Sequence, residues 1–338
     1  MRRRIYLSAD GGGSKLRMIL FDEDFRILGE GLSGGISMTQ ASEQDVRVNI
    51  GRCVEEVFSR TRLKAIDKFY CIMVGRSSSV FLLDAMKVYC PVTETIYMSE
   101  GSSGLLAGAL WRSGLLALSG TGSNVFYVPG DSPIHVQEKP GTITWSVGGW
   151  GSILGDQGSG VWIGQQAIQR AIAGMEGWAE PTNIMELIRR DWKPHSDKEI
   201  INMVYNSPAP FRKVASLTMI VEEAAYSGDQ VAMDILTEAG KLMAVQTLCL
   251  KNRHNIPEVD ERLVTCGGAW KTHRLFFETF KEEIAVKCPA LKMRRQRFEQ
   301  VMAGPAQVML EFMGESRADE AEEQLAFQFP AYEIRWKG

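Results

Sequence analysis

The sequence has 338 residues, of which 45% are hydrophobic and 23% are charged, and its formal net charge is −3 at pH 7. This composition is typical of a soluble globular protein, and the length suffices for two domains with their own cores. A slightly acidic chain is not expected to bind nucleic acid or an anionic membrane, since both favour a basic face, and no apolar run approaches the roughly 20 residues that span a bilayer.

The first third of the chain alternates between predicted strands and helices. Apolar runs predict strands over 4–10 and 16–22, which are joined by a glycine-rich turn, and a third strand over 26–31. Further along, the pattern predicts helices over 43–60, 79–88 and 103–112, separated by strands over 69–74 and 95–99. This order of elements indicates an α/β domain.

The same pattern begins again in the second third of the chain. Residues 115–131 predict a strand, a glycine-rich turn and a second strand. Gly11-Gly12-Gly13-Ser14 superposes on Gly120-Thr121-Gly122-Ser123 with a constant offset of 109 residues. Because strands flank both turns, we expect an internal duplication of domain size.

The remainder of the chain is predicted to be helical in its middle and α/β at its end. Residues 145–164 are too rich in glycine for a packed core element, whereas 183–253 are mostly helical in pattern. Later come a strand over 261–268, a helix, a strand over 291–296 and a helix over 304–315. We therefore expect an N-terminal domain of 1–113 plus 304–316, a C-terminal domain of 114–303 with a helical insertion, and a loosely attached acidic tail over 317–338.

The six cysteines are dispersed, with no C-x-x-C pair and no metal-type spacing. Reduced thiols in the cytoplasm are therefore expected. The four histidines are equally dispersed, so a zinc site is not expected. The arginines after Met1 are not followed by the apolar segment of a secretory signal.

Glycine-rich turns follow predicted strands at 10–14, 119–124 and 266–268. Glycine lets the main chain approach a ligand closely, and successive amides in such turns form a concavity that binds anions. Two such hairpins, one per domain, would hold the phosphates of a nucleotide, and the third turn would accept its adenosine. No P-loop motif occurs, and the G-x-G-x-x-G match at Gly29–Gly34 is not followed directly by a helix, so a dinucleotide site is not expected.

Four motifs together resemble the BadF/BadG/BcrA/BcrD ATPase family and, within it, the N-acetylglucosamine kinases of the actin/Hsp70/sugar-kinase superfamily. They are DGGGSK (10–15), LSGTGSN (118–124), VGGWGSILGDQGSGVWIGQQAI (147–168) and VTCGGAWK (264–271). The resemblance covers about residues 4–314. It implies duplicated actin-like (ribonuclease H-like) domains with a cleft between them, ATP and Mg²⁺ as cofactors, and a homodimer.

The resemblance also implies roles for individual residues. ATP would be bound by Asp10, Gly11, Gly12, Gly13, Ser14 and Lys15 in the first turn, by Gly120, Thr121, Gly122 and Ser123 in the second, and by Gly267 and Gly268 in the third. Asp10 would also hold the metal ion. The sugar would contact Asn124, Trp150 and Asp156.

The catalytic carboxylates each have a second interpretation. Glu100 aligns with the aspartate base of the resembled kinases but is one methylene longer, and it would otherwise cap the helix that follows. Asp156 matches an acid that contacts the sugar, or it caps the helix that begins near Val161. Trp150 lies on a sugar-pocket position, or it packs at a domain hinge.

Other positions depart from the family pattern. Gln157 stands where a glutamate is usual, and GLSGGISM (31–38) offers no evident sugar-binding asparagine. Gly75-Arg76-Ser77 replaces the usual Ser-Gly-Gly, which indicates either an anionic substrate or an arginine in solvent.

The function expected from these features is ATP- and Mg²⁺-dependent phosphorylation of a sugar or amino-sugar hydroxyl, with N-acetylglucosamine or glucosamine as the default acceptor and Glu100 or a neighbouring carboxylate as base. One alternative is an ATPase that activates a partner enzyme, although such activators hold an iron–sulfur cluster through cysteines whose spacing has no counterpart here. The other is a non-catalytic sensor of nucleotide or sugar.

Overall fold

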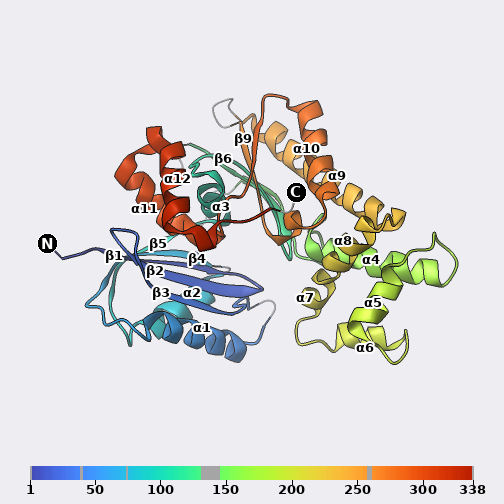
Figure 1. Ribbon diagram of the computed structural model, residues 1–338, viewed down its shortest axis with the longest axis horizontal. Helices are drawn as coiled ribbons and strands as arrows, with labels where there is room; N and C mark the ends of the chain where they lie inside the picture. The colour runs from blue at the N-terminus through green and yellow to red at the C-terminus, as the bar shows by residue number, and fades with distance from the viewer. Residues whose placement is uncertain (1, 39–40, 74, 131–144, 257–260, 337–338) are drawn as a thin grey trace. The chain divides into compact units, whose positions relative to one another are not determined.

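A computed structural model describes residues 2–38, 41–73, 75–130, 145–256 and 261–336 (Figure 1). The chain divides into two compact units, each described here by itself. The first unit comprises the described residues within 1–114, 128–143 and 294–335, and the second comprises those within 115–127, 144–293 and 336–338. Residues 294–303 and 317–335 thus belong to the first unit, whereas we expected the former in the C-terminal domain and the latter in a tail.

The first unit is built on a mixed five-stranded sheet in the order β3-β2-β1-β4-β5. Its strands are β1 (Ile5–Gly11), β2 (Lys15–Asp22), β3 (Ile27–Gly34), β4 (Ile66–Met73) and β5 (Val92–Tyr97). The first three strands are antiparallel neighbours, and β4 and β5 continue the sheet parallel to β1. All five were predicted, with boundaries that shift by a few residues.

Helices cover both faces of this sheet, as Figure 1 shows. They are α1 (Glu43–Phe58), α2 (Arg76–Met86), α3 (Glu100–Ala109), α11 (Ala303–Met313) and α12 (Ala318–Gln328), with short 3₁₀ turns η3 (Gln300–Met302), η4 (Glu315–Arg317) and η5 (Pro330–Tyr332). The α1/α2 face buries residues such as Leu7 and Ile50. The opposite face buries residues such as Tyr70 and Leu325.

The glycines of β3 allow α1 to lie directly against the sheet. A Cβ on Gly29 would lie 2.1 Å from the carbonyl oxygen of Val57, and one on Gly31 would lie 2.4 Å from that of Cys53. A Cβ on Gly34 would lie 2.7 Å from the side-chain amide of Asn49. Close packing of a helix therefore explains the G-x-G-x-x-G match in this strand.

The second unit repeats the strand order of the first. Its strands are β6 (Gly114–Ser119), β7 (Ser123–Val128), β8 (Trp145–Gly148), β9 (Arg262–Cys266) and β10 (Lys292–Arg295). The sheet order is β10-β9-β6-β7-β8, so β6 to β10 occupy the places of β1 to β5. The repeat agrees with the predicted duplication, but β8 was missed because Gly148 and its neighbours obscured a short strand.

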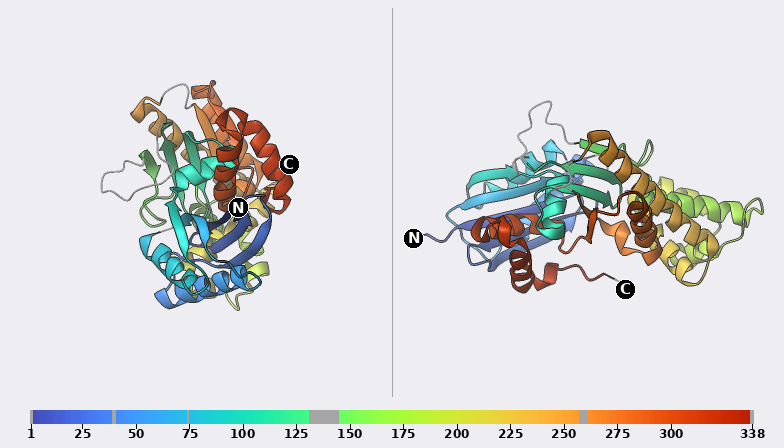
Figure 2. Two further views of the ribbon diagram at one scale, coloured as in Figure 1. Left: turned by 90° about the vertical axis from the view of Figure 1, so that its left-hand side faces the viewer. Right: turned by 90° about the horizontal axis from the view of Figure 1, so that it is seen from above.

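The second unit has seven described helices, and all of them except α7 contribute apolar side chains to one large core. The helices are α4 (Gly160–Met175), α5 (Ile184–Trp192), α6 (Glu199–Tyr205), α7 (Pro210–Ala215), α8 (Leu217–Tyr226), α9 (Gln230–His254) and α10 (Arg274–Lys287), with the 3₁₀ turn η2 (Gly268–Lys271). Figure 2 shows α9 and α10 alongside each other, and they are in extensive contact. Within the described residues, no helix has the length and apolarity needed to cross a membrane.

The C-terminal segment of the first unit is firmly packed, which corrects the expectation of a loose tail. Leu325 and Phe329 are fully buried in the core of that unit, and Tyr332 is 1% exposed. The buried carboxylate of Glu322 accepts two hydrogen bonds from the Arg294 guanidinium, at 2.9 and 3.0 Å. The acidic composition of the segment reflects ion pairing as well as solvation.

Candidate functional site

The first predicted phosphate loop is the turn between β1 and β2. Asp10 lies at the carboxyl end of β1, opposite Arg17 of β2 and beside Ile72 of β4. The turn is closed by a 2.9 Å hydrogen bond from the Gly12 amide to the Lys15 carbonyl oxygen. The Gly12 carbonyl oxygen accepts a further 2.9 Å bond from the Ile36 amide, which fixes the turn to the chain that follows β3.

Carboxylates gather near this turn. Burial raises the pKa of Asp10 to about 7; Lys15 opposes the rise, and the negative charges of Glu100 and Glu299 add to it. Burial also raises the pKa of Glu100. Asp10 lies near the end of β1 and Glu100 follows β5, and both strands are parallel to β4 between them, so the two carboxylates lie at the same edge of the sheet.

Glu100 does not act as the cap of the helix that it begins. The N-cap of α3 is Ser99, whose hydroxyl oxygen accepts a 3.0 Å hydrogen bond from the Ser102 amide. Glu100 is the first residue of α3 and is partly buried. The capping interpretation of this residue is therefore wrong, and its carboxylate remains available for other chemistry.

Lys15 forms an ion pair with a residue that the sequence did not single out. Its ammonium lies 2.7 Å from Glu299, whose other carboxylate oxygen lies 2.5 Å from the guanidinium of Arg17. Burial alone would raise the pKa of Glu299, but the hydrogen bond from Lys15 and the charges of Lys15 and Arg17 lower it overall. No local pattern predicts this contact, because Lys15 and Glu299 are 284 residues apart.

The second predicted phosphate loop, between β6 and β7, sits on the N-terminus of α4. The amides of Gly160 and Val161 donate to the carbonyl oxygens of Gly120 and Thr121, at 2.8 and 3.2 Å. The positive end of the helix dipole therefore lies beneath this loop and favours an anion near it.

The third predicted turn lies against the second. Strand β9 is parallel to β6, with Cys266 opposite Leu118, so Gly267 and Ser119 follow adjacent strand ends. A Cβ on Gly267 would lie 2.3 Å from the carbonyl oxygen of Ser119. The second unit thus brings the predicted phosphate-2 and adenosine turns together.

Asp156 lies beside the same loop. It is 6% exposed and has a positive φ of 58°, and its carboxylate accepts a 3.1 Å hydrogen bond from the Gly151 amide. A Cβ on Gly122 would lie 2.5 Å from the Asp156 carboxylate, so glycine is required there. Burial raises the pKa of Asp156, although hydrogen bonds from the amides of Gly151 and Ser123 act to lower it.

Asp156 is not a helix cap either. The N-cap of α4 is Ser159, whose hydroxyl oxygen accepts a 3.1 Å hydrogen bond from the Trp162 amide. The capping interpretation of Asp156 is therefore wrong, as it is for Glu100.

Two side-chain amides lie around the glycines that end β8. Asn124 of β7 is opposite Gly148, and a Cβ on Gly149 would lie 2.4 Å from its side-chain nitrogen. A Cβ on Gly148 would lie 2.7 Å from Oε1 of Gln246 in α9. Within the described part of the chain, the buried oxygens Oδ1 of Asn124 and Oε1 of Gln246 have no hydrogen-bond partner. Such acceptors suit donor groups of a ligand.

The sequence indicated Asn124 but missed Gln246, which is one of many polar residues on a long helix. Trp150 follows in the same glycine segment, between Gly149 and Gly151, and its side chain is 73% exposed. Both interpretations of Trp150, contact with the sugar and packing at a hinge, stay predictions. An exposed indole has apolar surface that a ligand could contact.

The predicted nucleotide turns contain glycines that neither packing nor backbone conformation demands. A Cβ on Gly12, Gly120 or Gly268 would meet no atom of the described residues within 4 Å, and none of the three has a positive φ. Room at the main chain is what a phosphate or nucleoside needs to reach backbone amides, so these turns fit ATP.

Asp10 fits a magnesium ion that is bound together with phosphates. Mg²⁺ is usually held by one or two carboxylates plus phosphate oxygens rather than by an all-protein cage. Among the described residues there is no group of three or more histidine, cysteine or acidic side chains arranged to hold a metal ion. Asp10 would be the protein ligand, since a nearby cation would favour the ionised form of a carboxylate whose pKa is raised chiefly by burial.

The structure describes two places where the sequence departs from the family pattern, the Gly75 turn and the segment after β3. Gly75 has a positive φ of 94° and precedes α2, while the Arg76 side chain lies outside the described part of the chain. No asparagine was evident in the segment after β3, but the Asn49 side chain of α1 donates a 2.9 Å hydrogen bond to the Gly35 carbonyl oxygen. An asparagine amide therefore does lie at that segment.

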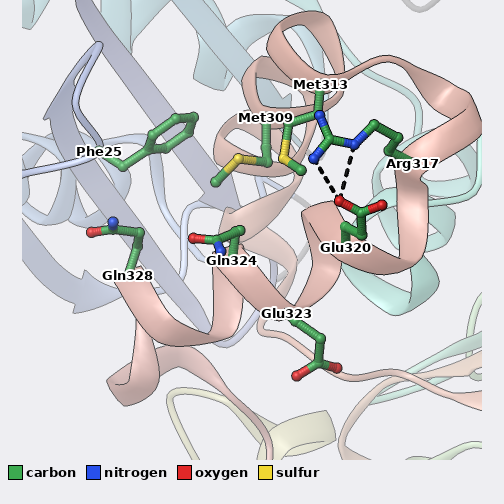
Figure 3. Close-up of a pocket in the computed structure, with 8 residues that line it drawn as sticks. All are labelled: Phe25, Met309, Met313, Arg317, Glu320, Glu323, Gln324 and Gln328. Atoms are coloured by element: carbon green, nitrogen blue, oxygen red, sulfur yellow. Dashed lines mark hydrogen bonds and ion pairs between the residues drawn. The ribbon is translucent and has the colours of Figure 1, made fainter.

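A separate groove of about 610 Å³ lies on the first unit (Figure 3). It is lined by Phe25, by residues of α11 and α12 and by Arg317, which pairs with Glu320 at 2.5 Å. None of the predicted site residues lines it. The groove is therefore not part of the candidate nucleotide or sugar site.

Comparison with known proteins agrees with the motifs. The sequence model of the BadF/BadG/BcrA/BcrD ATPase family matches residues 9–294. The chain is 25% identical over 299 residues to the N-acetylmuramic acid/N-acetylglucosamine kinase of Clostridium acetobutylicum, and the match covers 85% of this chain and 92% of that relative.

Solved structures share the fold. One is a candidate N-acetylglucosamine kinase from Porphyromonas gingivalis, with a TM-score of 0.67 and 19% identity, covering 91% of this chain and 99% of that one. Another is a ROK family glucokinase from Streptomyces griseus in complex with glucose and AMPPNP, with a TM-score of 0.53 and 16% identity, covering 94% and 99%. The predicted fold class is confirmed.

Proposed function

We propose that this chain, which belongs to the BadF/BadG/BcrA/BcrD ATPase family, is an ATP-dependent kinase of a sugar or amino-sugar hydroxyl. The observation that carries the proposal is that buried carboxylates lie next to open glycine turns. The Clostridium acetobutylicum relative is named as a kinase of N-acetylmuramic acid and N-acetylglucosamine. N-acetylated amino sugars are therefore the first acceptors to test.

Residues of the first unit would supply the proton acceptor and part of the phosphate site. The amides around Gly12 and the ammonium of Lys15 bind phosphate oxygens, and Glu100 takes the proton from the attacking sugar hydroxyl. As the hydroxyl oxygen bonds to the γ-phosphorus, the bond to the bridging oxygen breaks and ADP leaves with the electron pair. Burial supports Glu100 in this role, since a raised pKa brings a carboxylate closer to the pKa of an effective base at neutral pH.

The second unit would bind the rest of ATP and the acceptor. The Gly120–Ser123 turn, above the α4 N-terminus, binds phosphates, and the open main chain at Gly268 receives the adenosine. Asp156, Asn124 and Trp150 orient the sugar. Mg²⁺ held by Asp10 would neutralise charge on the triphosphate.

The test is phosphorylation measured directly across a panel of sugars. The purified chain is incubated with ATP and Mg²⁺ and with N-acetylglucosamine, N-acetylmuramic acid, glucosamine or glucose, and the sugar phosphate is detected by mass spectrometry. We expect at least one amino sugar to gain a phosphoryl group, with ADP released in equal amount. ATP hydrolysis that no sugar stimulates would support an ATPase instead, and ligand-dependent melting without turnover would support a sensor.

Assembly and location are part of the same proposal. A homodimer is expected and can be measured by light scattering of the purified chain. No disulfide joins any of the six cysteines, all of which are described residues, and this supports a reducing compartment such as the cytoplasm.

A further inference from the structure

Glu299 occupies a distinctive position in the first unit. It immediately precedes η3, and its amide donates a 3.0 Å hydrogen bond to the Tyr332 carbonyl oxygen. One carboxylate oxygen accepts from Lys15 at 2.7 Å and the other from Arg17 at 2.5 Å. A single acid thus bridges two cations that lie beside the predicted phosphate-1 turn.

The two cations differ in how firmly they are held. The Arg17 guanidinium also lies 4.5 Å from the centre of the Tyr332 ring, and its side chain is 24% exposed. The Lys15 side chain is 42% exposed and begins at the end of the open Gly12 turn. Arg17 is therefore anchored to the C-terminal segment, whereas the flexible lysine is the partner that can leave.

We propose that Glu299 is a positioning residue that holds Lys15 when no nucleotide is bound and releases it to the terminal phosphates of ATP, while Arg17 keeps the Glu299 carboxylate paired. This inference rests on the proposed function, because it assumes that ATP binds at the β1–β2 turn. The bidentate bridge makes the exchange possible without leaving Glu299 unpaired, since breaking the contact with Lys15 preserves the contact with Arg17.

The exchange has a measurable consequence for affinity. Wild-type protein must break the Lys15–Glu299 pair before Lys15 can bind phosphate, so replacing the acid by a neutral side chain should favour nucleotide binding. Partly exposed ion pairs are weak, and the expected decrease in the Kd for MgATP is about two- to fivefold.

The experiment is a double-mutant cycle on nucleotide affinity. Titration calorimetry with Mg²⁺ and AMPPNP is carried out on the full chain for wild type, Glu299→Gln, Lys15→Met and the double variant. We expect E299Q to bind the nucleotide more tightly and K15M more weakly, and we expect the gain from E299Q to disappear in the K15M background. In steady-state assays, E299Q should change the KM for ATP, which should fall, more than it changes kcat.

Two further variants test whether a change in nucleotide affinity comes from loss of the Lys15–Glu299 ion pair or from loss of a negative charge in general. Glu23→Gln removes an acid from the far end of β2, where Glu23 pairs with Arg4, and should leave affinity unchanged. Glu299→Asp keeps the charge but shortens the side chain, which weakens the contact with Lys15. Its nucleotide affinity should therefore rise less than that of E299Q, and it replaces E299Q in the experiment if that variant does not fold.

The outcomes distinguish this inference from the proposed function. If wild-type protein does not bind the nucleotide at all, the proposed function fails. If it binds the nucleotide but E299Q leaves the Kd unchanged or raises it, the inference is overturned. It is also overturned if the Glu299→Gln substitution lowers the Kd equally in the wild-type and K15M backgrounds, because Glu299 then does not act through Lys15.

Discussion

Gly267 lies against Ser119, so closely that a Cβ on the glycine would come within 2.3 Å of the serine carbonyl oxygen. The two residues follow neighbouring parallel strands, and Gly267 has a φ of 112°. Gly268, the next residue, has an ordinary φ and open space around it. The fold therefore requires glycine at 267, whereas at 268 we propose that glycine gives the adenosine access to the main chain.

This contrast predicts different effects of replacing the two glycines. Gly267→Ala should lower the melting temperature, because a side chain there is both strained and in collision. Gly268→Val should change the melting temperature little but weaken ATP binding at least tenfold, because its side chain fills the space that a nucleoside would need. Thermal melting and nucleotide titration of both variants check this, and equal loss of stability in the two would contradict it.

The base assignment predicts a kinetic signature for Glu100. Glu100→Gln should reduce kcat by about 10²- to 10⁴-fold and leave the Kd for ATP nearly unchanged. Because burial raises the pKa of Glu100, kcat/KM of the wild type should fall tenfold per pH unit on the acid side, with a midpoint above the ordinary glutamate value of 4.5. Glu94→Gln, at an exposed acid on β5, is the control, and an E100Q enzyme with normal kcat would disprove the assignment.

Asp10 should destabilise the ligand-free protein at neutral pH. Its pKa is about 7 in the folded state and near 3.8 when unfolded, so between these values the folded state binds more protons. The free energy of unfolding therefore falls as pH rises, by about 1.4 kcal/mol per unit, and levels off above pH 7.

Asp10→Asn removes this dependence. The variant should be more stable than wild type, with a difference that is small near pH 4 and grows up to about pH 7, when urea unfolding is measured with a chelator present. The same variant should lose Mg²⁺-dependent ATP binding. A stability difference that does not change with pH would show that the pKa of Asp10 is ordinary.

Asn124 should matter for the acceptor and not for the fold. Its buried Oδ1 lacks a partner within the described residues, so Asn124→Leu removes an unsatisfied polar group and should leave the melting temperature unchanged or higher. The KM for the sugar should rise at least tenfold while the KM for ATP stays the same. Equal increases in both values would place the residue elsewhere than in the acceptor pocket.

The C-terminal helix offers a matched pair for the packing of the first unit. Leu325 is fully buried, whereas Phe327, two residues further along α12, is 79% exposed. Leu325→Ala should destabilise the protein by about 2–5 kcal/mol, and Phe327→Ala should have little effect. Urea unfolding distinguishes these outcomes, and a negligible cost for L325A would restore the expectation of a loose tail.

Most of the strands and helices were predictable because their signals are local. The apolar runs around Asp10 and Gly120 identified hairpins, and the constant offset between them predicted the repeated strand order that the two sheets display. Strand β8 escaped prediction because it is short and ends in Gly148, so its residues do not show the alternation of a longer strand. The acidic character of 317–335 was misleading because residues such as Glu322 pair with arginines far away in the sequence.

The sequence by itself determined the family, the duplicated fold and the three glycine turns, because these depend on residue types at fixed local spacing. Only the tertiary structure decided that serines, and not Glu100 or Asp156, cap the helices, that Gln246 joins Asn124, and that Glu299 bridges Lys15 and Arg17. Such contacts join residues brought together by strand order and helix packing. A charge or an amide carries no local signal of the partner that folding will place beside it.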